Sequence, residues 1–310
     1  MKKIFIDGSA GTTGLRILQR LSERNDVELI SIPDELRKDN DARKKALNSC
    51  DIAFLCLPDA AAIEAVNMIE NENVIVLDTS TAHRTDEEWA YGFAELSEEH
   101  YKKIASSKRI AVPGCHASGF IALTYPLIEK GIISKDALLT CHSITGYSGG
   151  GKSMIADYEN EYREKLLDAP RQYALGQSHK HLPEMTKITG LKNAPVFCPI
   201  VSDFYSGMVV TVPLFKEQLN EGFSIEDIKK AYKEKYTTDI VLYEENIDEA
   251  GLISANALSF KDSMQVTVAG NSDRILLIAR YDNLGKGASG AALECMNIVM
   301  GNSPSEMLDV

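Results

Sequence analysis

A chain of 310 residues, 44% of them hydrophobic, is long enough for two domains, each with a core of ordinary size. Its 45 acidic and 33 basic residues give a net charge of −12, which argues against binding to nucleic acid or to an anionic membrane surface. The six cysteines form no CxxC pair, and no apolar run reaches the length of a membrane span. Because the N-terminus also has no signal-peptide core, the sequence predicts a soluble protein of the reducing cytoplasm.

The N-terminus predicts a strand, a glycine-rich turn and a helix. Lys3 to Ile6 is a short apolar strand, and an amphipathic helical pattern begins at Leu15. Glycines three residues apart between them would let the backbone approach a pyrophosphate at the start of the helix. The spacing is G-x-x-G-x-x-G rather than G-x-G-x-x-G, so a plain turn is the alternative. We predict a dinucleotide site formed by Gly8, Ala10, Gly11, Thr12, Thr13 and Gly14.

A charged segment follows the second predicted strand, residues 27–32. Asp34 and Glu35 could bind ribose hydroxyls, as acidic residues do in NAD-specific sites. The segment also carries four basic residues, Arg37, Lys38, Arg43 and Lys44. A basic cluster at this place suits a 2′-phosphate, so we predict NADP as the cofactor, with Arg37 at the phosphate. A solvated loop of mixed charge is the alternative.

Two further apolar strands, residues 52–57 and 74–78, alternate with a helix over residues 59–69. This alternation predicts a parallel sheet that is buried on both faces. Ligands bind beyond the carboxyl ends of such strands, where Ser80 and Arg84 follow the second of these two. A guanidinium group grips phosphate or carboxylate in a bidentate way, so Arg84 is a candidate anion ligand; a surface arginine is the alternative.

Cys115 is the most informative residue of the chain. A short strand over residues 110–112 runs into a Pro-Gly break, and a helical pattern follows over residues 117–129. The thiol is therefore expected at the start of a helix, where free backbone N–H groups and the helix dipole favour an anion. That setting can convert a thiol into a nucleophilic thiolate, although most free cysteines are only small buried hydrophobic residues.

The loop from Gly146 to Lys152 is rich in glycine and formally fits the P-loop pattern G-x-x-x-x-G-K-S. No apolar strand that ends in aspartate follows it as a second nucleotide-binding motif. A P-loop NTPase would also leave the N-terminal glycine loop and Cys115 without a role. We therefore reject a triphosphate site here.

Two histidines stand in the segment Ser178 to Met185. The pair His179 and His181 forms an HxH spacing, but no further cysteine or histidine cluster completes a metal site, and we predict no metal. Histidine titrates near neutral pH and is the natural acid/base partner of a thiol. Solvated loop histidines are the alternative.

The rest of the chain predicts an α+β domain and a C-terminal helix. The expected strands and helices cover residues 139–144, 208–212, 225–236, 265–268, 276–279 and 291–300. We expect a dinucleotide-binding domain of residues 1–114 and 286–310, to which the C-terminal helix returns. Residues 115–285 would form a catalytic and dimerisation domain.

Six motifs occur in a specific order along nearly the whole chain: GSAGTTG, LDTSTAHR, VPGCHASG, GYSGGGK, HKHLPEM and DNLGKGASGAALECMNIVMG. In this order they resemble the shorter form of the N-acetyl-gamma-glutamyl-phosphate reductases of arginine biosynthesis. That family is similar in fold to aspartate-semialdehyde dehydrogenase. The resemblance implies a Rossmann-like domain followed by an α+β catalytic and dimerisation domain. It also implies NADPH-dependent reduction of an acyl phosphate to an aldehyde, through a thioester on the enzyme.

Site residues follow from the resemblance position by position. Cys115 matches the nucleophile, and His181 is preferred as the acid/base, with His179 as a second polar contact. Arg84 matches the arginine that holds the substrate's phosphate or carboxylate, with Ser80 beside it. The residues that resemble those near the nicotinamide are Ser148, Gly149 and Asn283. After the cysteine the longer form has tyrosine, proline and threonine, whereas this chain has His116, Ala117 and Ser118.

Two other functions remain open from the sequence. The sister reaction on aspartyl phosphate needs the same thiol and cofactor. A non-catalytic, NADP-binding redox sensor would need a resolving cysteine, and none lies close to Cys115 in the sequence. For the catalytic reading we expect a small-molecule substrate and phosphate as ligands. We also expect a homo-oligomer, either a dimer or a tetramer.

Overall fold

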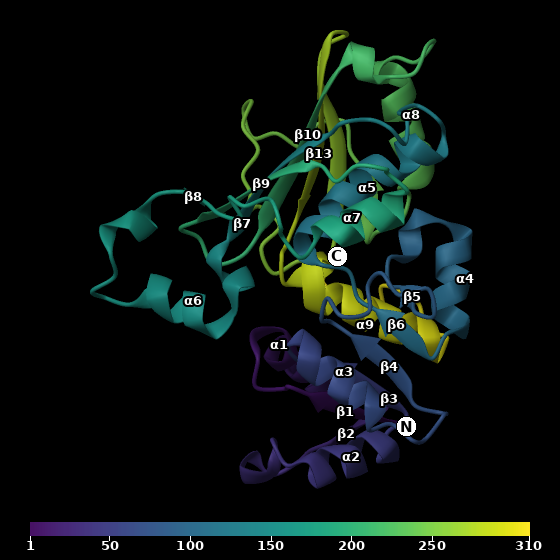
Figure 1. The fold of residues 1–310 in the computed structure, drawn as a ribbon, viewed down its shortest axis with the longest axis vertical. Coiled ribbons are helices and arrows are strands. Elements are labelled where there is room, and N and C mark those ends of the chain that lie inside the picture. The colour runs from purple at the N-terminus through teal and green to yellow at the C-terminus, as the bar shows by residue number, and fades with distance from the viewer. The chain divides into compact units, whose positions relative to one another are not determined.

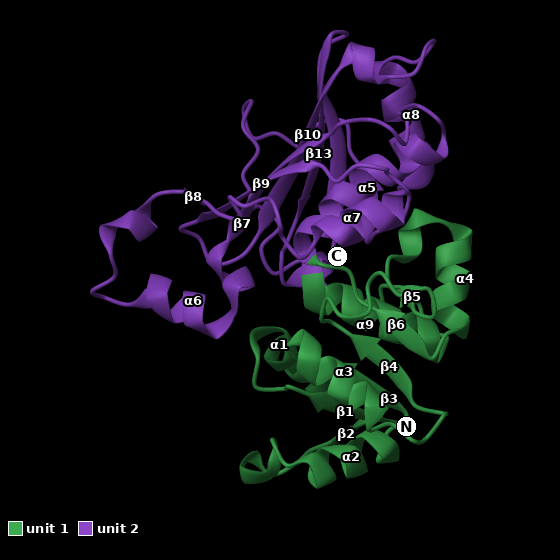
Figure 2. Ribbon diagram, in the orientation of Figure 1, with its two compact units in different colours: residues 1–114, 288–306 green, residues 115–287, 307–310 purple.

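The computed structural model describes all 310 residues and divides the chain into two compact units (Figure 2). Unit 1 contains residues Met1–Gly114 and Ala288–Glu306, and unit 2 contains Cys115–Gly287 and Met307–Val310. Each unit is built on a sheet of its own. The chain therefore passes into unit 2 at Cys115 and returns to unit 1 after Gly287.

Unit 1 has a six-stranded sheet of order β2-β1-β3-β4-β6-β5, in which all neighbouring strands are parallel. Its strands are β1 (Lys2–Asp7), β2 (Val27–Ile30), β3 (Ile52–Leu55), β4 (Ile75–Asp78), β5 (Ala90–Tyr91) and β6 (Arg109–Ala111). The inner strand β3 is buried along its whole length, as in a parallel sheet that is covered on both faces. The predicted Rossmann-like parallel sheet is confirmed.

Five α-helices belong to unit 1: α1 (Thr12–Ser22), α2 (Asn40–Ser49), α3 (Asp59–Asn67), α4 (Glu98–Ser106) and α9 (Gly290–Met300). The sequence analysis did not predict α2 and α4, because neither has a pronounced apolar stripe. Their starts are marked by capping residues instead. The carboxylate of Asp39 accepts a hydrogen bond from the N–H of Ala42 at 2.8 Å, and the hydroxyl of Ser97 accepts one from the N–H of His100 at 3.2 Å.

The C-terminal helix α9 belongs to unit 1, as predicted. Nine of its eleven residues are buried, so its surroundings are apolar on almost every side. Arg24 extends from the end of α1 and donates a hydrogen bond to the amide oxygen of Asn297 at 2.7 Å. This contact ties the last helix to the first helix of the chain.

Unit 2 has a mixed seven-stranded sheet of order β11-β12-β13-β10-β7-β9-β8. Its strands are β7 (Thr140–Gly146), β8 (Arg171–Gln172), β9 (Val196–Ser202), β10 (Met208–Phe215), β11 (Val241–Tyr243), β12 (Met264–Gly270) and β13 (Arg274–Tyr281). The pairs β7–β9 and β11–β12 are parallel, and the other pairs are antiparallel. The sequence analysis did not predict β9, which carries a proline at position 199.

The helices of unit 2 are α5 (Cys115–Glu129), α6 (Gly151–Glu159), α7 (Leu182–Thr189) and α8 (Ile225–Lys235). Helices α5, α7 and α8 lie together on one side of the sheet (Figure 1). Residues on this side are buried, whereas alternate residues, which point to the opposite side, include the exposed Ile144, Val196 and Leu276. One face of this sheet is therefore covered by helices, and the other presents apolar side chains.

Helix α5 contains a proline whose effect on hydrogen bonding is compensated by the residue that follows α8. Pro126 has no N–H to donate to the carbonyl of Ala122, four residues earlier. The hydroxyl of Tyr236 donates to that carbonyl at 2.6 Å, and the hydroxyl of Tyr232 donates to the carbonyl of Leu123 at 2.5 Å. Two tyrosines thus satisfy carbonyls of a helix that is buried on nearly all sides.

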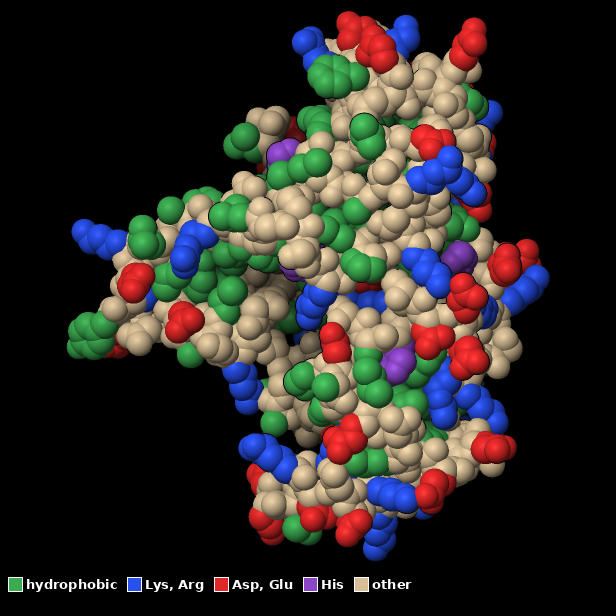
Figure 3. Space-filling model, viewed as in Figure 1, with side chains coloured by type: hydrophobic (Ala, Val, Ile, Leu, Met, Phe, Trp, Pro, Cys, Tyr) green, Lys and Arg blue, Asp and Glu red, His purple; other side chains and the backbone are tan.

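Acidic and basic side chains are interspersed on the face of the molecule that Figure 3 shows. This face has no large patch of a single charge. Many of them form exposed pairs, such as Lys102 with Glu98 and Lys192 with Asp136. No helix of the structure is both long enough and apolar enough to cross a membrane.

The approach of α5 to the sheet generates a stability prediction. A Cβ on Gly119 would lie 2.6 Å from the hydroxyl oxygen of Tyr281 and 2.7 Å from a methyl group of Val210. We expect Gly119→Ala to lower the free energy of unfolding by about 1–3 kcal/mol, because over-packing forces neighbours apart. Urea unfolding followed by circular dichroism measures the change. Gly176→Ala is the control, since its Cβ would come no closer than 3.8 Å to another atom, and equal stability of the two variants would contradict the prediction.

Candidate active site

Cys115 is the first residue of α5, as the sequence predicted for a thiol at the start of a helix. Its side chain is partly exposed. The hydroxyl of Tyr281, at the end of β13, donates to the carbonyl of Cys115 at 2.5 Å and accepts a hydrogen bond from the N–H of Gly119 at 3.0 Å. A Cβ on Gly287 would lie 3.0 Å from the Cβ of Cys115, so only a glycine fits there without a shift. The backbone of Cys115 is thus fixed by Tyr281, and its Cβ lies close to Gly287.

The other cysteines differ from Cys115 in their surroundings. Burial raises the pKa of Cys50 and of Cys56 to about 12, and it also raises the pKa of Cys141. Cys295 is buried on α9. Thiols of this kind stay protonated and unreactive near neutral pH. Among the cysteines, only Cys115 combines partial exposure with a helix N-terminus.

Three histidine rings gather near Cys115 within unit 2. His116 is the next residue of α5, and His179 and His181 precede α7. The centroid of the His116 ring lies 5.7 Å from that of His179 and 5.6 Å from that of His181, and the last two are 4.7 Å apart. The ring of Phe197 packs against this group from β9. The structure brings the predicted pair His179 and His181 together with a third histidine, to which the sequence analysis gave no role.

His179 and His181 differ in how they are held. The backbone N–H of His181 donates to Nδ1 of His179 at 3.2 Å, so the neutral His179 carries its hydrogen on Nε2. Burial and, to a smaller extent, the charge of Lys180 lower the pKa of His179. His181 is almost entirely buried. No group of histidine, cysteine and acidic side chains in the structure has a geometry that could hold a metal ion.

Ser148, Gly149 and Asn283 come together in unit 2. The amide of Asn283 donates to the hydroxyl of Ser148 at 3.0 Å and accepts from the N–H of Gly207 at 2.8 Å. A Cβ on Gly149 would lie only 3.2 Å from the amide nitrogen of Asn283. Asn283 therefore fixes the 3-10 turn η3 (Tyr147–Gly150), which contains Ser148 and Gly149.

The preceding residue, Asp282, was missed by the sequence analysis. Its buried carboxylate accepts hydrogen bonds from the N–H groups of Leu284 (2.6 Å), Gly285 (2.9 Å) and Phe260, and from the hydroxyl of Ser206 (2.8 Å). These hydrogen bonds fix the backbone at the start of the π-helix η6 (Gly285–Ser289). The sequence signal for this role was the position of the aspartate directly before Asn-Leu-Gly. Aspartate side chains at such positions often accept hydrogen bonds from the N–H groups of the following turn.

In unit 1 the glycine loop has the form that a pyrophosphate site requires. Gly8 has φ +87°, and a Cβ there would lie 2.3 Å from the carbonyl oxygen of Cys56. Gly14 is equally restricted, because its Cβ would lie 2.5 Å from the carbonyl oxygen of Gly8. Gly11 is the N-cap of α1 and has no side chain to occupy the first N–H groups of that helix. Ala10 lies in this turn, and Thr13 is the second residue of α1.

Thr12 carries a further sign of a ligand at this loop. Its hydroxyl oxygen is buried and has no hydrogen-bond partner in the structure. Buried polar atoms are nearly always paired, so an orphaned hydroxyl at a bare helix N-terminus fits a bound phosphate oxygen. The residues present therefore fit a dinucleotide.

The basic cluster after β2 is smaller than the sequence suggested. Arg43 is buried, and its guanidinium group is 3.0 Å from the carboxylate of Asp7 at the end of β1. Lys44 pairs with Glu70 at 2.5 Å. Arg37 and Lys38 are exposed and remain as the basic residues that could meet a 2′-phosphate.

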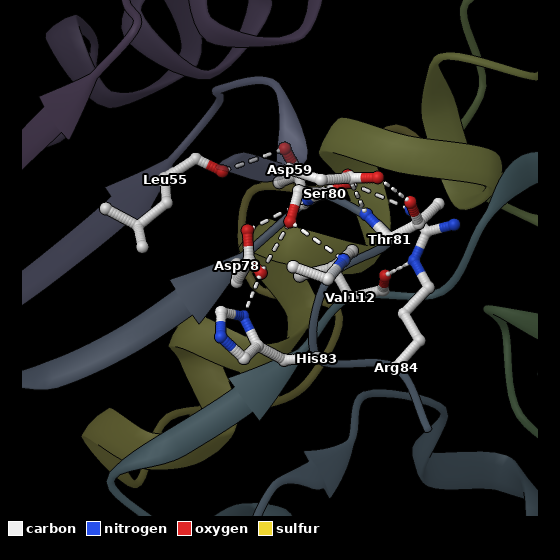
Figure 4. A network of polar contacts seen from close by, with 10 residues as sticks. Leu55, Asp59, Asp78, Ser80, Thr81, His83, Arg84 and Val112 are labelled. Atoms are coloured by element: carbon white, nitrogen blue, oxygen red, sulfur yellow. Dashed lines mark hydrogen bonds and ion pairs between the residues drawn. The ribbon is translucent and has the colours of Figure 1, made fainter. Parts of the chain in front are cut away.

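Ser80 and Arg84 follow β4 and are held in a network that Figure 4 shows. Arg84 is buried, and it donates from Nε to the carbonyl of Val112 and from Nη2 to the carbonyl of Thr79, both at 2.8 Å. The hydroxyl of Ser80 donates to the buried carboxylate of Asp78 at 2.7 Å. Arg84 thus contacts Val112, which precedes Cys115 by three residues in the sequence.

His83, which the sequence analysis passed over, is part of the same network. Its Nδ1 lies 2.6 Å from Oδ2 of Asp78, the same oxygen to which the hydroxyl of Ser80 donates. Its ring stacks on Trp89 with centroids 4.0 Å apart. The Asp78 carboxylate therefore joins Ser80 and His83 and orders the loop that carries Arg84.

These two units define a semialdehyde dehydrogenase. The family model "Semialdehyde dehydrogenase, NAD binding domain" matches residues 33–104, and "Semialdehyde dehydrogenase, dimerisation domain" matches residues 115–283. Aspartate semialdehyde dehydrogenase II from Vibrio cholerae, complexed with ASA, superposes with a TM-score of 0.73 over 97% of this chain and 98% of its own, at 14% identity. The enzyme from Candida albicans with NADP gives a TM-score of 0.68 over 99% and 100%, at 16% identity. At such identities these structures show the fold alone.

Sequence comparison specifies the family further. The chain is 46% identical over 305 residues to N-acetyl-gamma-glutamyl-phosphate reductase of Rhizobium etli, covering 96% of this chain and 98% of that protein. It is 43% identical over 312 residues to N-acetyl-gamma-glutamyl-phosphate reductase 2 of Nostoc sp., covering 96% and 97%. The chain belongs to the N-acetyl-gamma-glutamyl-phosphate reductase family, which confirms the resemblance found in the six motifs.

The exposed cation after β2 generates a prediction on cofactor choice. We expect Arg37→Glu to weaken NADPH binding roughly tenfold or more and to leave NADH binding nearly unchanged, because a carboxylate would repel the 2′-phosphate. Fluorescence titration gives both dissociation constants. Lys45→Glu makes the same charge change on the exposed face of α2 and should affect neither. An equal loss of NADPH and NADH binding in Arg37→Glu would remove this residue from the phosphate site.

Proposed function

We propose that this protein reduces N-acetyl-glutamyl 5-phosphate to N-acetyl-glutamate 5-semialdehyde and phosphate with NADPH, in arginine biosynthesis. The names of its relatives give the substrate, and the observation that carries the chemistry is the partly exposed thiol of Cys115 at the first residue of α5. The sister reaction on aspartyl phosphate is tested in the same assay. Aspartate semialdehyde dehydrogenases share the fold with this chain at only 14–16% identity.

Cys115 acts as the nucleophile in this proposal. Its thiolate attacks the acyl carbon, and the electron pair of the carbonyl π bond moves to oxygen. The carbonyl then re-forms as the bond to phosphate breaks, which leaves a thioester on Cys115. The start of α5 at Cys115 supports a role for backbone N–H groups of this helix as donors to the transient oxyanion.

The histidine pair supplies the proton transfers. Protonation of His179 at Nδ1 would break its hydrogen bond with the N–H of His181, and its pKa is already lowered. His179 therefore suits a neutral contact that donates from Nε2 to the substrate. We assign the acid/base role to His181, which deprotonates the thiol and later protonates the oxygen of the hemithioacetal.

The dinucleotide is held by the glycine loop in unit 1. Gly8, Gly11 and Gly14 shape the turn, and the hydroxyl of Thr12 and the first N–H groups of α1 donate to the pyrophosphate. Arg37 binds the 2′-phosphate, and Ser148, Gly149 and Asn283 contribute to the nicotinamide side. When bound, NADPH supplies the hydride that reduces the thioester.

Arg84 and Ser80 are the proposed substrate contacts of unit 1. Two N–H groups of Arg84 are used by the carbonyls of Val112 and Thr79, which orients its guanidinium group. In this proposal the guanidinium group binds the substrate's phosphate or carboxylate. The hydroxyl of Ser80 donates to Asp78, and its oxygen accepts from the N–H of Ala82 at 3.2 Å, so one lone pair of that oxygen remains as an acceptor for the substrate.

A homo-oligomer, a dimer or a tetramer, fits the uncovered face of the unit 2 sheet. Register places the exposed Ile144 beside Ile200 on that face, and the exposed Leu276 and Phe215 lie farther along it. A second copy would cover these side chains, in agreement with the dimerisation domain matched over residues 115–283. We also propose a cytoplasmic location, which suits six free cysteines.

The nucleophile is tested by substitution. We expect Cys115→Ser to keep the fold and NADPH binding but to lose at least about 100-fold in reductase rate, because serine's hydroxyl is far less ionised than a thiol. The rate is measured in the reverse direction with NADP, phosphate and either N-acetyl-glutamate semialdehyde or aspartate semialdehyde. Cys50→Ala is the control, since that thiol is buried in unit 1. Near-normal turnover of Cys115→Ser would refute the assignment, and preference for aspartate semialdehyde would refute the substrate.

The two histidines are separated by their pH–rate profiles. In the wild type we expect a limb near histidine's ordinary pKa of about 6.5. This limb should vanish in His181→Asn, in which Cys115 still reacts slowly with iodoacetamide. It should persist in His179→Asn, whose defect should appear mainly as a higher KM. The reverse pattern would exchange the two roles, and an unchanged profile in both variants would exclude both residues from acid/base catalysis.

A further inference from the structure

The residue directly after Cys115 links two hydroxyl groups from distant parts of unit 2. His116 is buried at the start of α5. Its Nδ1 lies 2.7 Å from the hydroxyl oxygen of Ser143 on β7, and its Nε2 lies 2.7 Å from the hydroxyl oxygen of Tyr173, next to β8. Neither hydroxyl has another hydrogen-bond partner in the structure. The three groups therefore form one isolated chain of hydrogen bonds.

The ring of His116 is neutral throughout the pH range of the reaction. Burial and, to a smaller extent, the neighbouring His179 lower the pKa of His116 to about 3. A neutral imidazole has one N–H and one acceptor nitrogen. One of the two hydroxyls must therefore donate to the ring, and the other must accept from it.

Ser143 decides between these two arrangements. Its side chain is completely buried, and His116 is its only partner. If Nδ1 carried the hydrogen, Ser143 would accept, and its own O–H would be buried with no acceptor, which is unfavourable. Ser143 therefore donates to Nδ1, and Nε2–H donates to the oxygen of Tyr173. The hydrogen of the Tyr173 hydroxyl then points away from the ring and is free to donate elsewhere.

We propose that Tyr173 is a further catalytic residue, which donates a hydrogen bond to the substrate's carbonyl oxygen, and that His116 is the positioning residue that directs this hydrogen toward it. This proposal rests on the proposed function of Cys115. As the bond from sulfur to carbon forms, the carbonyl π pair moves to oxygen, and the Tyr173 hydroxyl stabilises that oxygen without transferring its proton. The same hydrogen bond serves when the thioester is reduced.

The position and the acidity of Tyr173 agree with this role. Tyr173 is partly buried, and its ring centroid is 6.0 Å from that of His179. Burial and the nearby charge of Cys115 both raise the pKa of Tyr173, so its hydroxyl keeps its proton wherever the enzyme is active. Tyr173 is thus a permanent hydrogen-bond donor beside the rings of His116 and His179.

A double-mutant cycle tests the coupling. Tyr173→Phe should lower kcat about 100-fold, as expected for loss of one oxyanion donor, while iodoacetamide still alkylates Cys115 within about twofold of the wild-type rate. Ser143→Ala should lower kcat about tenfold, because Nδ1 loses its donor and the ring no longer fixes the Tyr173 hydrogen. In the Tyr173→Phe background, Ser143→Ala should have no further effect on kcat. An equal loss from Ser143→Ala in both backgrounds would overturn the proposal.

Tyr162→Phe is the matched control, because Tyr162 lies in the segment between α6 and β8 and is 92% exposed. It should leave kcat and KM unchanged. Comparable losses of kcat in Tyr162→Phe and Tyr173→Phe would also overturn the proposal. Such a result would mean that removing any tyrosine hydroxyl from this segment lowers kcat.

Nitrogen-15 NMR of the full-length protein tests the tautomer without any turnover. The ring of His116, assigned by the signal that disappears in His116→Gln, should show the Nε2–H tautomer and no titration between pH 5.5 and 9. In Ser143→Ala the fixed tautomer should be lost. An Nδ1–H tautomer or a titrating ring would overturn the proposal. Normal reductase activity of Cys115→Ser would instead overturn the proposed function, and the two failures are therefore distinct.

Discussion

The hydroxyl of Tyr281 holds the first turn of α5 from both sides, donating to the carbonyl of Cys115 and accepting from the N–H of Gly119. This contact fixes where the helix starts relative to β13, and with it the backbone that carries the thiol. It requires α5 to lie very close to the sheet, which is why Gly119 has no room for a side chain. Gly287, in the segment after β13, also has little room for a side chain, because its Cβ would lie 3.0 Å from the Cβ of Cys115. The position of the thiol thus depends on a segment more than 160 residues away in the sequence.

The remaining contacts of α5 extend this dependence through unit 2. The helix is buried on almost all sides, so each of its unsatisfied polar groups needs a partner from another element. One tyrosine of α8 and the tyrosine that follows this helix satisfy the carbonyls near Pro126. The side chain of His116 contacts β7 and the residue after β8. The hydrogen bonds that stabilise the helix therefore also order the groups around Cys115.

The fold was largely predictable because its strands and several of its helices carry a local signal. Apolar runs such as Ile52–Leu55 predict inner strands of a parallel sheet by composition alone. Elements that depend on partners were missed. Strand β9 carries a proline within its apolar run, and α2 and α4 are recognised by their capping residues rather than by an apolar stripe. The basic cluster after β2 was overestimated for the same reason, since no local pattern shows that Arg43 pairs with Asp7.

The sequence by itself determined the order of strand, glycine loop and helix, the cysteine at the start of a helix, and the motifs that place the chain in its family. These features are encoded by residues within a few positions of one another. The tertiary structure decided what surrounds the thiol. Tyr173 and Ser143 meet His116 across 57 and 27 residues, and Asn283 meets Ser148 across 135. A hydroxyl or an amide can bond to many partners, and only the folded arrangement of the strands selects one of them.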